Sequence, residues 1–176
     1  LAWLAKYLEE NHSKVAVISL MWANNETGVV TDIKAITTLA KDFSIPVHSD
    51  AVAAFGHLPA SFKDSGLAAM SISAHKLGGP VGIGALIVSR ATKLVSIIHG
   101  GGQERGMRSG TMNAPVAKAF AKAAEIAFTG RTLMADEALE LGLINHVVEH
   151  ERLLDFSRAL ASEITSNAPL AVRAIK

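Results

Sequence analysis

The chain has 176 residues, of which 49% are hydrophobic and 19% charged, which excludes an intrinsically disordered chain and predicts one domain, or one domain with a helical appendage. Its 17 basic and 16 acidic residues give a net charge of +1, so we expect no surface for nucleic acid or anionic lipid. No apolar run reaches the roughly 18 residues of a membrane span. The lack of cysteine excludes disulfides, thiolate metal sites and cysteine nucleophiles, and it fits a reducing compartment. We therefore expect a soluble cytoplasmic protein.

The first two thirds of the chain alternate short β-branched runs with helical patterns, which is typical of an α/β fold. The runs predict strands near residues 15–20, 45–49, 68–73 and 83–88. Between the first two runs, apolar residues recur with helical spacing and predict a helix over 32–43, with Thr31 or Asp32 as its N-cap. We therefore expect strands and helices to follow one another along the chain.

The last third has a different composition. Residues 1–124 carry 12 basic and 8 acidic residues, a net charge of +4, whereas residues 125–176 carry 5 and 8, a net charge of −3. The patterns in this part predict helices over 114–128, 135–141 and 153–167 and an extended segment over 143–148. The first helix should end at the break Thr129-Gly130, the second at Gly142 as its C-terminal glycine, and the third at Asn167 and Pro169. No linker of low complexity separates the two parts.

Polar residues follow three of the predicted strands, at the edge where α/β sheets bind ligands. They are Asn24, Asn25 and Glu26 after the first strand, His48 and Asp50 at the second, and Ser73, His75 and Lys76 at the third. A lysine and a carboxylate at neighbouring strand ends are what an aldehyde cofactor with a basic ring nitrogen requires, and Ser73 and His75 would donate to its phosphate. The alternative is ordinary structure: Lys76 as a solvated surface residue, Asp50 as a strand-end cap and His48 as a histidine with local partners.

Four segments in this part match one family in order and spacing. They are MWANNETGVV at 21–30 followed by Asp32-Ile33, HSDAVAAFG at 48–56, SISAHKLGGPVGIGAL at 71–86 and HGGGQERGMRSGT at 99–111. Residues 1–124 therefore resemble the cysteine desulfurases of the class V aminotransferase group. The resemblance implies a partial three-layer αβα large domain with a mixed sheet of about four strands, the last of them antiparallel.

The resemblance also implies roles for six residues in binding pyridoxal 5'-phosphate. Lys76 matches the lysine that bonds to the cofactor, Asp50 the partner of the pyridine nitrogen, Asn25 the ligand of the ring oxygen, Ser73 and His75 the phosphate contacts, and Thr111 the residue that reaches the phosphate of the other subunit. It therefore implies a homodimer and an amino-acid substrate of the L-cysteine class.

The sequence departs from this family in several places. Ala53 stands where a glutamine is usual, and Val81 where a lysine is usual. The family's upstream third, with the histidine that stacks on the ring, has no counterpart before Leu1. Its small domain, with the sulfur-accepting cysteine and the arginine for the substrate carboxylate, has none after residue 124. We therefore expect a cofactor-binding fragment without full desulfurase activity.

The remaining segment resembles a second family. EIAFTGRTLMADEALELGLINHVV at 125–148 and NAPLAVRAIK at 167–176 are similar to the C-terminal helical segment of enoyl-CoA hydratases and isomerases, the crotonase group. This resemblance implies a crotonase-like helical segment over 125–176, fused to the first part as in an engineered or mis-assembled chimera. The oxyanion-hole amides that such an enzyme needs are absent here.

Two alternatives therefore stand beside the cofactor-binding fragment: an acyl-CoA protein of the crotonase type, and a chimeric scaffold without activity. Glu137, Glu140 and Glu163 are interpreted as helix-surface charges. His146 to His150 fits the spacing of a zinc motif, but Val147 and Val148 favour an extended segment rather than the required helix, so we expect no metal site.

Overall fold

The computed structural model describes residues 1–141 and 143–166, and the chain folds into two compact units, Leu1–Gly130 and Arg131–Lys176. The change in composition and net charge after residue 124 falls within helix α4 (Ala114–Thr129), and the whole of this helix belongs to the first unit. The two units are described separately below.

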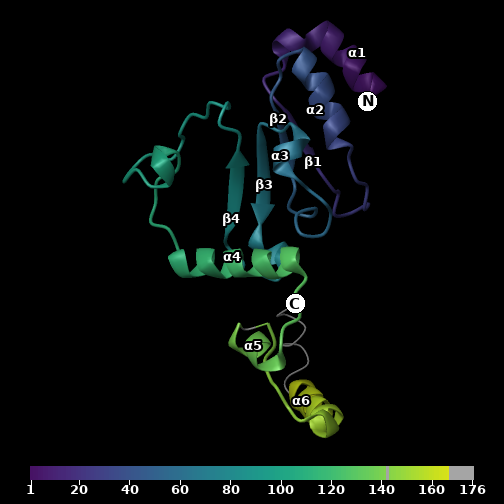
Figure 1. Cartoon of the computed structure of the whole chain (residues 1–176), viewed down its shortest axis with the longest axis vertical. Coiled ribbons are helices and arrows are strands. Elements are labelled where there is room, and N and C mark those ends of the chain that lie inside the picture. The colour runs from purple at the N-terminus through teal and green to yellow at the C-terminus, as the bar shows by residue number, and fades with distance from the viewer. Residues whose placement is uncertain (142, 167–176) are drawn as a thin grey trace. The chain divides into compact units, whose positions relative to one another are not determined.

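A four-stranded mixed sheet forms the centre of the first unit. Its strands, in spatial order, are β1 (Ile18–Met21), β2 (Val47–Asp50), β3 (Ala69–Ser73) and β4 (Gly84–Val88). The first three are parallel and β4 is antiparallel to β3 (Figure 1). The expected α/β fold with about four strands and an antiparallel last strand is therefore confirmed.

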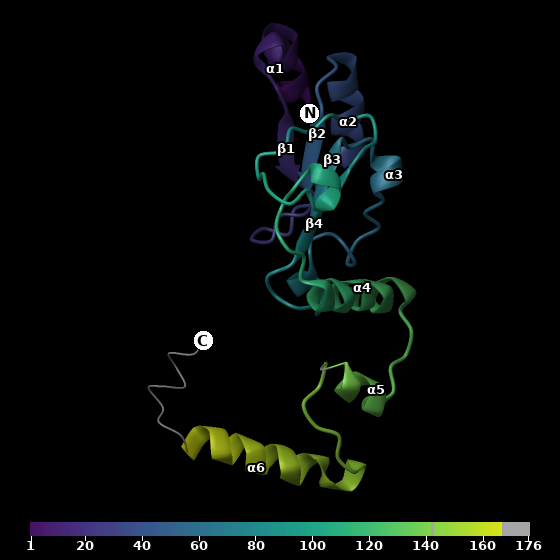
Figure 2. The ribbon, with the colours of Figure 1, turned by 90° about the vertical axis from the view of Figure 1, so that its left-hand side faces the viewer.

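Helices α2 (Ile33–Asp42) and α3 (Phe62–Ser65) lie on the same side of the sheet (Figure 2). Asp32 is the N-cap of α2, because its Oδ1 accepts a hydrogen bond of 3.0 Å from the amide of Ala35. Helix α1 (Ala2–Asn11), which the sequence reading did not anticipate, buries Leu8 completely. The remaining short helices of this unit are η1 (His12–Lys14), η2 (Ala74–Leu77) and η3 (Glu104–Gly106).

Alternation along β2 divides the sheet into two faces. Val47 and Ser49 are buried, whereas His48 and Asp50 are half-buried on the opposite face. The buried face packs with α1 and α2 in a single hydrophobic core, whose members on neighbouring elements include Leu8, Ile33, Ala40, Met70 and Ile72. The hydroxyl of Ser49 is buried in this core and has no hydrogen-bond partner among the described residues.

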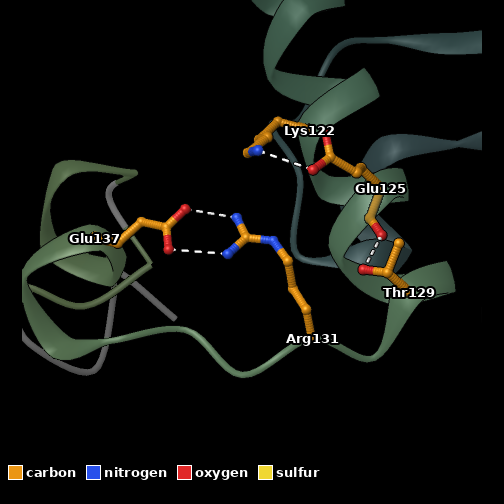
Figure 3. Close-up of polar contacts among 5 residues, drawn as sticks. All are labelled: Lys122, Glu125, Thr129, Arg131 and Glu137. Carbon is orange, nitrogen blue, oxygen red and sulfur yellow. Dashed lines mark hydrogen bonds and ion pairs between the residues drawn. The ribbon is translucent and has the colours of Figure 1, made fainter.

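The second unit contains α5 (Ala135–Glu140), η4 (His150–Arg152) and α6 (Leu153–Ser166). The guanidinium of Arg131 donates two hydrogen bonds to the carboxylate of Glu137, at 2.9 and 2.5 Å (Figure 3). The rings of His146 and Phe156 meet edge to face, with centroids 5.0 Å apart. The described residues of 143–148 form no strand, and the features expected at Gly142 and at 167–176 lie outside the described residues.

Across residues 1–141 and 143–166, no helix combines the length and the apolar character needed to cross a membrane. The same residues contain no group of three or more histidine, aspartate or glutamate side chains that could hold a metal ion, and this range includes His146 and His150.

Candidate active site

The carboxyl ends of the three parallel strands meet at one edge of the sheet. Met21 at the end of β1 pairs in register with Asp50 at the end of β2, and Asp50 pairs with Ser71 near the end of β3. Figure 1 shows these strands pointing toward α4, which packs beside η2 at this edge. The fold therefore gathers the polar residues that follow the strands, as the sequence predicts for an α/β sheet.

Asp50 presents a carboxylate with one oxygen held and one open. Its Oδ1 accepts a hydrogen bond of 2.9 Å from the amide of Val52, which fixes the side chain at the strand end. Its Oδ2 has no partner among the described residues. A half-buried carboxylate in this state can accept one further hydrogen bond, such as one from a protonated ring nitrogen.

Lys76 lies in η2, three residues beyond the end of β3. The backbone around it is fixed on both sides: Ala74 is completely buried, and Gly78 closes the turn in the left-handed region, with φ +72°. The Nε2 atom of His57 lies 2.9 Å from the backbone oxygen of Lys76. The amino group is exposed and has no partner among the described side chains, so its neutral form is accessible to an electrophile.

Ser73 and His75 form a second polar pair at this edge. The hydroxyl of Ser73 lies 2.8 Å from Nδ1 of His75, and it also donates a longer hydrogen bond of 3.4 Å to the backbone oxygen of Ile83. His75 is exposed and its Nε2 has no partner in the described part of the chain. The pair can therefore contribute donors to an anionic group.

The two remaining predicted residues are less closely joined to this cluster. Asn25 lies in the exposed loop after β1, and its side-chain amide donates a hydrogen bond of 2.7 Å to Glu26. Thr111 is exposed and precedes Asn113, the N-cap of α4, and makes no hydrogen bond to the residues of the strand edge in the described structure. The fold thus brings together Asp50, Ser73, His75 and Lys76, places Asn25 in a loop of the same edge, and leaves Thr111 outside the cluster.

Helix α4 and the loop after β2 support the backbone around Lys76. The rings of Phe55 and Phe128 meet edge to face with centroids 4.8 Å apart. Gly56, with φ +82°, is so close to Leu77 that an added Cβ would lie 2.2 Å from its Cδ2. The sequence does not indicate His57 or the contact between Gly56 and Leu77, because neither Gly56 nor His57 belongs to a periodic pattern or directly follows a strand.

A groove of about 920 Å³ opens at the opposite end of the sheet. It is lined by residues of α2, of the start of β2, and of the segments before β3 and after β4, among them Lys34, Lys41 and Lys93. None of the six predicted site residues lines it, so the groove and the candidate active site are separate features.

Three findings relate the chain to known proteins. The family model of aminotransferase class-V matches residues 3–162. An IscS-like cysteine desulfurase of Mycobacterium tuberculosis is 49% identical over 121 residues, which are 69% of this chain and 31% of that protein. The cysteine desulfurase IscS of Clostridium botulinum strain Hall is 45% identical over 153 residues, which are 87% of this chain and 35% of that protein.

Solved structures give the same relationship. The NifS-like protein of Rickettsia africae superimposes with a TM-score of 0.67 at 37% identity, over 72% of this chain and 36% of that one. The chain therefore spans about a third of the length of the relatives it matches. The family model runs through residue 162, across most of the segment predicted to be crotonase-like, and so does not favour a crotonase origin or a chimera.

Class V aminotransferases and cysteine desulfurases depend on pyridoxal 5'-phosphate. The donor set at the strand edge fits this group. Within residues 1–141 and 143–166, one carboxylate oxygen of Asp50 and the amine of Lys76 have no partner, and Ser73 with His75 forms a polar pair at the same sheet edge.

Proposed function

Because the chain belongs to the aminotransferase class-V family, we propose that its first unit binds pyridoxal 5'-phosphate at the carboxyl edge of the sheet. One observation carries the proposal: Oδ2 of Asp50 at the end of β2 and the amine of Lys76 after β3 have no partner among the described residues, and the two strands are neighbours. An ordinary surface lysine would not require a carboxylate with one open oxygen at the end of the neighbouring strand.

The cofactor, when bound, supplies an aldehyde carbon and a pyridinium ring that withdraws electrons from the substrate. Lys76 contributes the amine that bonds to the aldehyde carbon, and η2 fixes its backbone. Asp50 accepts the ring N–H through Oδ2 while Val52 holds Oδ1. Ser73 and His75 donate to the phosphate.

Two further contacts complete the proposed site. Asn25 would donate to the ring oxygen once its amide leaves Glu26. Thr111 is exposed and matches the family position that reaches the phosphate of the other subunit, so we assign it that contact in a second copy. We therefore propose a homodimer.

Cysteine, as in the related desulfurases, is the substrate class that we propose for the complete site. Sulfur transfer also needs an acceptor at the reacting centre, and a thiolate is the side chain that combines nucleophilicity with the ability to carry a persulfide. These 176 residues contain no cysteine. We propose that this chain alone binds the cofactor but does not release sulfur from cysteine faster than the free cofactor does.

Absorption spectroscopy tests the binding proposal. Titration of the chain with pyridoxal 5'-phosphate should give a saturable visible band that is absent in Lys76→Ala. Lys63→Ala removes an exposed lysine of α3 instead and should keep the band. A band of equal intensity in Lys76→Ala would contradict the proposal, because it would show reaction at other lysines.

A sulfide assay tests the second part of the proposal. With cysteine, cofactor and a reductant, the chain should release sulfide at the rate of free cofactor. Release well above that rate, and lost in Lys76→Ala, would show that the described residues suffice for turnover.

A further inference from the structure

A hydrogen-bonded bridge of side chains crosses the three parallel strands next to Asp50. The Nδ1 atom of His48 on β2 lies 2.8 Å from the hydroxyl of Ser19 on β1. Its Nε2 atom lies 2.8 Å from the hydroxyl of Ser71 on β3. A neutral imidazole has one donor and one acceptor nitrogen. With the proton on Nδ1, the ring donates to Ser19 and accepts the O–H of Ser71; with the proton on Nε2, the Ser71 oxygen accepts from the ring and its O–H stays free.

The strand register makes the two halves of this bridge different. Ser19 is directly opposite His48, whereas Ser71 is opposite Asp50. The bond from His48 to Ser71 is therefore diagonal, and it engages the hydroxyl that lies beside the carboxylate. Because side chains alternate along a strand, His48 and Asp50 project from the same face of β2.

Ser71 has few other partners on this face. On its other side it pairs with Leu86 of β4, which is apolar. Asp50 is flanked in its own row by Met21 and Ser71, and only Ser71 carries a hydroxyl that could donate to the carboxylate. By the strand register the Ser71 hydroxyl has two candidate acceptors, the His48 ring and the Asp50 carboxylate, and in this structure it lies 2.8 Å from Nε2 of the ring.

We propose that His48, with its ring proton on Nδ1, is a positioning residue: by accepting the O–H of Ser71 at Nε2, it keeps Oδ2 of Asp50 open for the ring nitrogen of the cofactor. The inference rests on the proposed function for the nature of that ring, but the side-chain arrangement is a property of the chain without cofactor. A hydrogen bond to a charged acceptor is stronger than one to a neutral acceptor. Without His48, the freed hydroxyl therefore turns to Asp50 and occupies the oxygen that the cofactor needs.

The experiment compares five full-length chains: wild type, His48→Ala, His48→Ala with Ser71→Ala, His48→Gln and Ser19→Ala. The first readout, without cofactor, is the 13C chemical shift of the Asp50 carboxyl carbon by NMR. The second is the dissociation constant for pyridoxal 5'-phosphate from the visible band. Ser19→Ala is the matched control, because it removes the exposed end of the bridge and leaves the contact between His48 and Ser71.

In His48→Ala the Asp50 resonance should shift and the dissociation constant should rise about tenfold, the effect of one competing hydrogen bond. Removing Ser71 as well should return both readouts to within about twofold of wild type, since no hydroxyl then competes for Asp50. Ser19→Ala should match wild type. So should His48→Gln, whose amide oxygen can still accept from Ser71. If His48→Ala does not fold, a shifted Asp50 resonance with weakened cofactor binding in folded His48→Gln would overturn the inference.

A merely structural role for His48 predicts the opposite pattern. The double variant, which loses a second member of the bridge, would then bind pyridoxal 5'-phosphate as weakly as His48→Ala, or more weakly. This result would overturn the inference. An unchanged Asp50 resonance in folded His48→Ala would overturn it too. If the wild type forms no visible band, the proposed function fails, and the Asp50 resonance alone decides the inference.

Discussion

Substitution of Gly56 by alanine should destabilise the first unit through two separable costs. Gly56 has φ +82°, and an L-residue in the left-handed region costs about 1–2 kcal/mol. The new Cβ would lie 2.2 Å from Cδ2 of Leu77, so that flexible side chain must leave its rotamer, at about 0.5–1.5 kcal/mol. The free energy of unfolding should therefore fall by about 1.5–3.5 kcal/mol.

Gly28 provides the matched control. Its φ is +72°, but no atom lies within 4 Å of the position that a Cβ would take. Gly28→Ala therefore carries the backbone cost alone, about 1–2 kcal/mol, and any gain from a stiffer unfolded chain is common to both variants. The difference between the two variants isolates the contact with Leu77.

Urea unfolding followed by tryptophan fluorescence measures both variants, because Trp3 and Trp22, the two tryptophans of the chain, belong to the first unit. Gly56→Ala should be the less stable variant, and the excess should disappear when both glycine substitutions are repeated in a Leu77→Ala background. Equal destabilisation of the two variants in the wild-type background would refute the reasoning.

Three further substitutions test other parts of the structure by the same measurement or by circular dichroism. Ser49→Ala removes a buried hydroxyl without a described partner, so the free energy of unfolding should equal that of the wild type or exceed it by about 1 kcal/mol. A fall of about 1 kcal/mol in the free energy of unfolding would show that the hydroxyl has a partner. Asp32→Ala removes the N-cap of α2 and should cost about 1 kcal/mol, whereas Asp32→Asn should cost much less. Glu137→Gln breaks the paired hydrogen bonds with Arg131, but both side chains are about a third exposed. The free energy of unfolding, measured from the loss of helical circular dichroism on heating, should therefore fall by no more than about 1 kcal/mol. No change at low salt would show that the pair contributes nothing to stability.

The sheet could be predicted from the sequence because its signals are local. In the run Ile45-Pro46-Val47 the proline disfavours a helical Ile45 and the β-branched residues favour a strand, and Asp50 at its end follows from chain order alone. The predicted extended segment over 143–148 forms no strand in its described residues, although Val147 and Val148 favour one, because β-propensity needs a neighbouring strand to become structure.

The bridge through His48 could not be predicted in the same way. Ser19 and Ser71 are 29 and 23 residues away from His48 in the chain, and only the strand register brings the three side chains together. Alternation along a strand indicates which residues share a face but not which residues lie opposite them. Helix α1 was missed because its buried stripe is short, with Leu8 as its single fully buried residue.

Mass mapping after borohydride reduction tests the central claim, that Lys76 is the site of cofactor attachment. The full-length chain would be incubated with pyridoxal 5'-phosphate, reduced, digested and analysed by peptide mass spectrometry, with Asp50→Ala in parallel. The proposed site predicts that the added mass lies predominantly on the peptide containing Lys76, and that this labelling falls in Asp50→Ala at limiting cofactor. Labelling spread evenly over the exposed lysines, and unchanged by Asp50→Ala, would contradict it.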